Sequence, residues 1–254
     1  MTASSGGGAP TRATLRVLEG VMEGLPEGVE AIAMTSDLQG CDTAQAPVSM
    51  RRLLGCVVAE ALGRMCEEDG LDPLTLGVVL AGDLYAPPDL KRRGGLGDVD
   101  GVWSSFGERF RWVVGVAGNH DQFHGRTSVL GAFSNAERVH PLDGDRVSVD
   151  GVTVAGISGV LGRSHKPWRM APKRWAGLLE RLLRRPHPEL LVLHEGPEVA
   201  GRTGSPVVRE ALEATRARPL VVFGHSYWPE PVAELGNGVQ VINVDSRVVV
   251  FKRP

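Results

Sequence analysis

Three consecutive polar residues, Asn119, His120 and Asp121, follow an apolar, valine-rich stretch that begins at Trp112 and ends at Gly118. Runs of this length and composition are typical of buried strands. A glycine at the end of such a run lets the chain turn sharply, so that the next side chains lie just beyond the strand. An amide oxygen, an imidazole and a carboxylate are groups that bind metal ions and transfer protons. The stretch therefore indicates a metal or acid–base site.

The same design recurs at four more apolar runs. They end at Asp37 in EAIAMTSD, Asp83 in TLGVVLAGD, His194 in ELLVLHEG and His225 in PLVVFGHSY. One strand ending in Gly-Asn is explained equally well as a simple turn with solvated side chains. Five such runs in one chain are hard to explain by chance. Because ligands bind at the carboxyl ends of strands in open α/β sheets, we expect the five ends to share one site.

Length and composition are those of a soluble globular protein, with 254 residues, 42% hydrophobic and 23% charged. The net charge of −2 gives no broad attraction to nucleic acid or to anionic membranes, so a phosphate would have to be bound locally. The three cysteines lack metal-finger spacing, and no segment resembles a signal peptide or a membrane span. We therefore expect a cytoplasmic protein with no membrane partner, for which nucleic acid is possible only as a substrate.

Helical and strand patterns alternate in the first part of the chain, and hairpins follow toward the end. Helices are predicted at 12–25, 47–69, 102–110, 172–185 and 207–218. A hairpin turning at Asp150-Gly151 and two strands at 238–244 and 247–251 complete the predicted elements. Residues 1–11 are rich in Gly and Ser and are predicted to be a flexible tail, followed by one domain over 12–254. The pattern predicts an α/β domain with a mixed sheet, or two stacked sheets, covered by helices.

In their order along the chain, these motifs resemble those of the calcineurin-like metallophosphoesterases. The matching residues are Asp37, Gly82-Asp83, Gly118-Asn119-His120-Asp121, His194 and Gly224-His225. The resemblance spans about residues 30 to 251; the motifs in this order are specific, although each dipeptide alone is weak. It implies a four-layer α/β/β/α double β-sandwich with mixed sheets. It also implies hydrolysis of phosphomonoesters or phosphodiesters by metal-activated water, with two divalent ions.

The resemblance assigns four residues to one metal ion. Asp83 would bridge the two ions, and Asn119, His194 and His225 would complete the site of one of them. An amide oxygen, two imidazoles and a carboxylate suit Mn, Fe or Zn. The resemblance therefore predicts one complete metal site.

The other metal site departs from the family pattern. The family's Asp-x-His is Asp37-Leu38-Gln39 here, and its Gly-His-x-His is Gly224-His225-Ser226-Tyr227. By resemblance, the two missing imidazoles would serve the same ion, for which Asp37, the Gln39 amide oxygen and the Tyr227 phenol remain. We therefore expect this ion to be weakly held, replaced by a harder ion such as Mg or Mn, or absent.

The remaining candidate residues would act on the substrate. By resemblance, His120 would contact the phosphate or protonate the leaving oxygen, and Asp121 would orient the His120 ring. Arg163, His165 and Lys166 belong to a basic stretch, GRSHKPWRM, that could clamp a phosphate or could simply be a solvated loop. Both interpretations of the basic stretch stay open at the level of sequence.

Two functions therefore compete. The first is a metal-dependent phosphoesterase, favoured by His120 and the complete set of donors around Asp83. The second is a non-catalytic phosphate-binding or partner-binding protein on the same fold, favoured by Gln39 and Tyr227. In either case the specificity would reside in loops such as 86–101 and 162–170.

Overall fold

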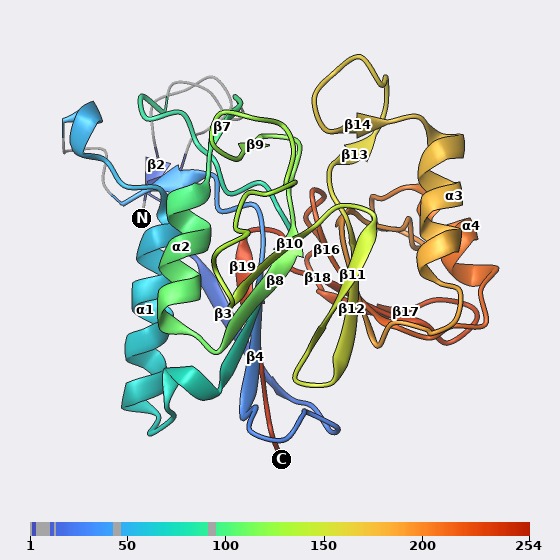
Figure 1. The fold of residues 1–254 in the computed structure, drawn as a ribbon, viewed down its shortest axis with the longest axis horizontal. Coiled ribbons are helices and arrows are strands. Elements are labelled where there is room, and N and C mark those ends of the chain that lie inside the picture. The colour runs from blue at the N-terminus through green and yellow to red at the C-terminus, as the bar shows by residue number, and fades with distance from the viewer. Residues whose placement is uncertain (1, 4–10, 13, 43–46, 91–94) are drawn as a thin grey trace.

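The computed structural model describes residues 2–3, 11–12, 14–42, 47–90 and 95–254. Two six-stranded sheets lie face to face at the centre (Figure 1). One sheet is covered on its outer face by two helices, and the other sheet is covered by two more. The helices are, in that order, α1 (Leu54–Glu68) and α2 (Asp100–Arg109), then α3 (Pro172–Leu182) and α4 (Pro206–Glu213). The four-layer α/β/β/α prediction is confirmed.

The first sheet has the strand order β10-β8-β6-β4-β19-β3. Its strands are β3 (Arg16–Val21), β4 (Ala31–Thr35), β6 (Leu76–Leu80), β8 (Trp112–Val116), β10 (Val139–Leu142) and β19 (Arg247–Lys252). The neighbours β10, β8, β6 and β4 run parallel, whereas β19 is antiparallel to β4. The carboxyl ends of β4, β6 and β8 therefore lie at the same edge.

The second sheet has the strand order β11-β12-β15-β16-β18-β17. Its strands are β11 (Asp145–Val149), β12 (Val152–Ile157), β15 (Leu190–Glu195), β16 (Leu220–Gly224), β17 (Val232–Glu234) and β18 (Gln240–Asn243). The central strands β12, β15, β16 and β18 are parallel, and the outer strands β11 and β17 are antiparallel to their neighbours. Both sheets are thus mixed.

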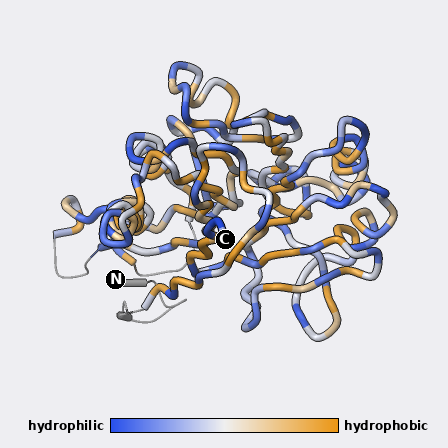
Figure 2. Tube along the Cα trace, turned by 90° about the horizontal axis from the view of Figure 1, so that it is seen from below, coloured by the Kyte–Doolittle hydropathy of each residue, from blue (hydrophilic) through white to orange (hydrophobic). Residues whose placement is uncertain are grey.

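Alternating side chains of the central strands separate three layers of core. In β8, Val113 packs with the helices α1 and α2, whereas Val114 packs between the two sheets. In β15, Val192 packs between the sheets and Leu191 faces α3 and α4. A strand buried on both faces reads as a continuous apolar run, which is why these strands were recognisable from composition. Figure 2 shows such hydrophobic runs passing through the middle of the molecule.

In the described ranges, seven short strands lie outside the two six-stranded sheets. They are β1 (Thr2–Ala3), β2 (Thr11–Arg12), β5 (Gly40–Cys41), β7 (Gly97–Asp98), β9 (Asp121–Gln122), β13 (Val160–Leu161) and β14 (Arg169–Met170). The predicted flexible tail over 1–11 falls mostly on residues outside the described ranges. Within them, β1 pairs with β2 and with β5.

The helix predicted over 12–25 is wrong, because residues Arg16–Val21 form the strand β3. The apolar residues at helical spacing also satisfy a strand at the edge of the sheet, where Leu18 and Met22 pack against the core between the sheets. The strand pairs in parallel with β19, near the other end of the sequence. A partner so distant in sequence leaves no local signal, and tertiary pairing overrides the helical pattern.

The helix predicted over 47–69 begins later than expected, at Leu54. Residues Val48–Met50 form a short 3-10 turn (η1), and Leu53 bridges to Cys41 with an extended backbone. A second 3-10 turn, η2 (Pro73–Thr75), leads into β6. In the described part of the chain, no helix combines the length and the apolar character needed to cross a membrane.

The hairpin turn at Asp150-Gly151 joins the two sheets. Asp150 has a left-handed φ of 49° and accepts hydrogen bonds from Arg111 Nε (2.5 Å), Arg111 Nη2 (2.9 Å) and Trp112 Nε1 (2.8 Å). The hydrogen bond from Arg111 lowers the pKa of this carboxyl group. The carboxylate therefore stabilises the folded protein at neutral pH.

We expect Asp150→Asn to lower the free energy of unfolding at pH 7 by about 1–2 kcal/mol, because Asn keeps the left-handed turn but loses the charge. The folded pKa lies below the unfolded value of about 4, so this contribution is complete above that pH and is lost as the pH falls through the folded pKa. Urea unfolding of both proteins at pH 7 and at about pH 2.5 measures the difference. A difference that persists undiminished in acid would contradict the charge-based explanation.

Candidate metal centre

Polar side chains from both sheets meet where β4, β6, β8, β15 and β16 end. Glycines make this convergence possible, because they leave room for the donor atoms of neighbouring turns. A Cβ atom on Gly118 would lie 2.0 Å from Asp83 Oδ1, and a Cβ atom on Gly224 would lie 2.4 Å from Asp37 Oδ2. These two glycines therefore serve the close approach of separate strand ends as well as the local turns.

The backbone at the donors themselves is strained. Asp37, Asp83 and His225 have left-handed φ values of 54°, 54° and 67°. Non-glycine residues adopt this region at a cost of about 1–2 kcal/mol, and they persist there only where the surrounding structure fixes them. Such strain clusters at functional sites, which is consistent with a binding role for this edge of the sheets.

Three of the predicted ligands form a compact group. Among the described residues, Asp83, His194 and His225 are the cluster of His, Cys, Asp or Glu side chains whose ligand atoms all lie within 4.8 Å of one another. The rings of His194 and His225 have centroids 5.0 Å apart. Asn119 adjoins the group, because the next residue, His120, donates its backbone N–H to Asp83 Oδ1 (2.9 Å). The chemistry of this donor set fits a divalent transition-metal ion.

Two buried atoms of this group make no hydrogen bond. They are Asn119 Oδ1 and His194 Nε2. His194 Nδ1 lies 2.7 Å from the carbonyl oxygen of Ala81, which can only accept, so Nδ1 carries a proton and Nε2 is the nitrogen that would present its lone pair to a metal ion. Buried polar atoms are rarely left without a partner. An amide oxygen and an imidazole nitrogen without hydrogen-bond partners are atoms that a metal ion would satisfy, so these residues fit a metal site.

Charges in the group shift the pKa values strongly. Burial would raise the pKa of Asp83, but the neighbouring His194 and His120 lower it to about 2. Burial would lower the pKa of His194, but Asp83 and then Asp37 raise it to about 10. Burial and the proximity of His194 lower the pKa of His225 to about 4. A proton on His194 and a metal ion would therefore compete for the charge of Asp83.

A cavity of about 580 Å³ opens next to this group. Its lining includes three residues of the predicted second metal site, namely Asp37, Gln39 and Tyr227. The Gln39 amide nitrogen donates to Asp83 Oδ2 at 3.1 Å. The Tyr227 side chain is 49% exposed, and its ring centroid lies 4.6 Å from the guanidinium carbon of Arg247. This half of the cavity thus offers oxygen donors and an amide N–H in place of imidazoles.

Two residues of the cavity were missed at the level of sequence. Asp245 and Ser246 line it beside Asp37, and burial followed by the charge of Asp245 raises the pKa of Asp37 to about 8. The sequence does contain a signal for Asp245, because this acidic residue directly follows the predicted strand over 238–244, just as a polar donor follows each of the other five apolar runs.

His120 lines the cavity with one ring nitrogen already engaged. Its Nδ1 lies 2.6 Å from the carbonyl oxygen of Gly95, which again requires the proton on Nδ1. Its Nε2 lies 3.8 Å from Asp83 Oδ2. The segment predicted as a loop over 86–101 thus reaches His120 at Gly95, with residues 91–94 of it outside the described ranges. Its end is not a loop, because β7 forms there and α2 begins at Asp100.

Asp121 does not orient the His120 ring, contrary to the role that the resemblance implied. Its buried carboxylate accepts backbone N–H groups from Asp83 (2.9 Å), Leu84 (2.8 Å), Tyr85 (3.2 Å) and Gly118 (2.8 Å). The Gly95 carbonyl group fixes His120 instead. Asp121 therefore holds together the turns that follow β6 and β8.

The basic stretch lies in the loop between β13 and β14. Arg163, His165 and Lys166 are exposed, and none of them is among the described residues that line the cavity beside Asp83. Trp168 anchors the loop, since its Nε1 donates to the Asp121 carbonyl oxygen (2.5 Å). The structure thus places this loop near the GNHD turn but does not bring the three predicted clamp residues into the cavity.

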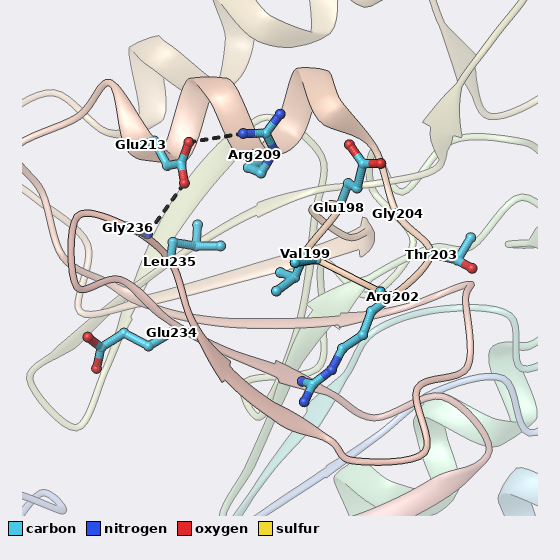
Figure 3. A pocket seen from close by; sticks show the side chains of 12 residues that line it. Glu198, Val199, Arg202, Thr203, Gly204, Arg209, Glu213, Glu234, Leu235 and Gly236 are labelled. Atoms are coloured by element: carbon cyan, nitrogen blue, oxygen red, sulfur yellow. Dashed lines mark hydrogen bonds and ion pairs between the residues drawn. The ribbon is translucent and has the colours of Figure 1, made fainter.

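A second, larger cavity of about 760 Å³ lies next to α4 (Figure 3). Arg209 pairs there with Glu213 (3.4 Å), and Arg202 pairs with Glu230 (3.1 Å). Both arginines of this cavity therefore have acidic partners, and none of its described lining residues is a His, Cys, Asp or Glu of the compact group at the strand ends. The strand-end site is therefore the stronger candidate for function.

Comparisons with known proteins leave the family of this chain open. No protein-family model matches the sequence, and no curated protein matches it. Solved structures that resemble the fold include two proteins from Thermus thermophilus. A hypothetical protein from Thermus thermophilus has 18% identity and a TM-score of 0.48, with 84% of this chain and 75% of that chain covered.

The second is the Thermus thermophilus sulfate thiohydrolase SoxB in complex with glycerol. It has 14% identity and a TM-score of 0.47, with 89% of this chain covered. This chain spans about half, 53%, of the length of that protein.

Proposed function

We propose that this chain is a metal-dependent phosphoric ester hydrolase acting on phosphomonoesters or phosphodiesters. The observation that supports it most directly is the convergence of Asp83, His194 and His225, together with unpartnered buried atoms on Asn119 and His194. The order of the motifs, which resembles that of the calcineurin-like metallophosphoesterases, supports phosphoric esters as the substrate class. The mixed nitrogen and oxygen donors favour Mn, Fe or Zn, and Mg is an alternative.

The residues of the site would have two roles, metal binding and contact with the substrate. Asp83, Asn119, His194 and His225 would hold the ion, which when bound would polarise a phosphoryl oxygen and lower the pKa of water. Hydrogen bonding to Ala81 fixes the His194 ring so that its free nitrogen faces the ion. With Nδ1 held by Gly95, His120 Nε2 is the atom that can bind the phosphate or donate a proton to the leaving oxygen.

Hydrolysis by reloaded protein tests the proposal. Protein stripped by a chelator is supplied with Mn, Mg, Ni or Zn, and cleavage of p-nitrophenyl phosphate and of its bis-ester is followed. We expect activity to disappear on stripping and to return with at least one metal. Metal and phosphate binding without turnover would favour the phosphate-binding alternative, and the absence of both would contradict the proposed site.

We expect His120→Ala to lower kcat by about 100- to 10,000-fold, the range typical for a lost acid–base group. The variant should still bind metal, because the metal-binding side chains are unchanged. Steady-state kinetics and metal content measured on the same preparation separate the two effects. His140→Ala, a change in β10 away from the cavity, is the matched control and should keep full activity.

A further inference from the structure

The two oxygens of Asp83 have different surroundings. Oδ1 accepts the backbone N–H of His120 (2.9 Å) and lies 3.4 Å from His194 Nε2. Oδ2 accepts the side-chain N–H of Gln39 (3.1 Å). An amide that donates to a carboxylate oxygen turns its hydrogens, which repel a cation, toward that oxygen. Each oxygen thus accepts one N–H, and the difference lies in the neighbouring donors: two imidazoles, of His194 and His225, join Asp83 in one compact group, whereas beside Oδ2 lie the Gln39 amide hydrogens and, at 3.8 Å, His120 Nε2.

One oxygen of Asp37 is occupied in a similar way. Its Oδ2 accepts the Ser36 hydroxyl (2.7 Å) and the backbone N–H of His225 (2.9 Å). Among the described residues, Asp37 is not part of the cluster whose ligand atoms lie within 4.8 Å of one another. Its carboxylate thus holds the turn that presents His225, which is a supporting role for the ion beside His225.

A fixed positive charge lies behind this half of the cavity. Arg247 is only 3% exposed; its Nη2 donates to the Trp228 carbonyl oxygen and its Nε donates to the Asp245 carbonyl oxygen (3.2 Å). The ring of Tyr227 packs against the guanidinium group. The Arg247 charge offsets the carboxylates on this side and disfavours a further cation.

From these contacts we infer that the centre holds one divalent ion per chain, and that the Gln39 amide sets this number. The inference rests on the proposed function, because it presupposes the ion held by Asp83, Asn119, His194 and His225. The part of the cavity lined by Asp37, Tyr227 and Ser246 is then left to substrate atoms.

Metal stoichiometry tests the inference independently of activity. Wild-type protein is incubated with excess Mn²⁺ and passed through a desalting column. Manganese per chain is then measured by mass spectrometry, and electron paramagnetic resonance reports whether the ions are isolated or coupled. We expect one manganese per chain with the spectrum of an isolated ion. Two tightly bound, coupled ions would overturn the inference and leave the proposed function intact, whereas no bound ion would overturn both.

The isosteric variant Gln39→Glu tests the role of the amide. It replaces the N–H donor by a carboxylate oxygen opposite Asp83 Oδ2, so we expect a second manganese per chain and a coupled spectrum. Gln122→Glu makes the same change at a residue outside the cavity lining and should keep one ion. If Gln39→Glu retains one ion, the amide does not set the number. Should this variant not fold, the wild-type stoichiometry still decides between one ion and two.

Discussion

Asp83→Asn is expected to abolish tight metal binding and to lower the rate of hydrolysis by more than about 100-fold. Losing a residue that only supports a metal ligand lowers metal affinity or activity by up to about 100-fold. Because Asp83 is proposed to bind the ion directly, its loss should have a larger effect. The substitution keeps the size of a buried side chain and removes its charge. It thereby removes the anion that faces His194 Nε2 at 3.4 Å and weakens the attraction for any cation.

Folding is expected to survive this change. Without the Asp83 charge, the pKa of His194 falls toward the value set by burial, and the imidazole becomes neutral. Manganese content, p-nitrophenyl phosphate hydrolysis and thermal unfolding should be measured together. Asp145→Asn, on the exposed start of β11, is the matched control. Unchanged metal content and activity in Asp83→Asn would exclude the proposed centre.

Asp121→Ala is expected to destabilise the fold by more than about 3 kcal/mol. It leaves the N–H groups of Asp83, Leu84, Tyr85 and Gly118 without their acceptor. A buried donor left unpaired costs about 1–3 kcal/mol, and several lost together approach the whole stability of a domain, about 5–15 kcal/mol.

Urea unfolding of Asp121→Ala and Asp121→Asn measures this effect. Asn retains one carbonyl oxygen for part of the donors, so its loss of stability should lie between those of wild type and Ala. If Asp121 acted only in catalysis, its substitution would instead lower activity with little change in the unfolding midpoint. The two readouts thus distinguish a supporting residue from one that acts on the substrate.

The layered α/β fold and the ends of the strands that build the site are predictable from local sequence patterns. Strands buried on both faces read as continuous apolar runs, and a polar donor marks where each run stops, with a glycine before it at Asp83, Asn119 and His225. Asp83, Asn119, His194 and His225 were recognisable because both signals are local. The same local signal also follows the strand over 238–244, where Asp245 was overlooked.

The pairing of these strands and side chains depends on contacts between segments that are distant in sequence. The edge strand β3 depends on β19, over two hundred residues away, and its own pattern fits a helix equally well. Atoms from separate strand ends decide whether Gln39 turns its nitrogen or its oxygen toward Asp83. They also decide whether the Asp121 carboxylate binds the His120 ring or a set of backbone N–H groups. Residue type fixes which groups are available, whereas hydrogen-bond partners are fixed by packing between segments that the sequence does not bring together.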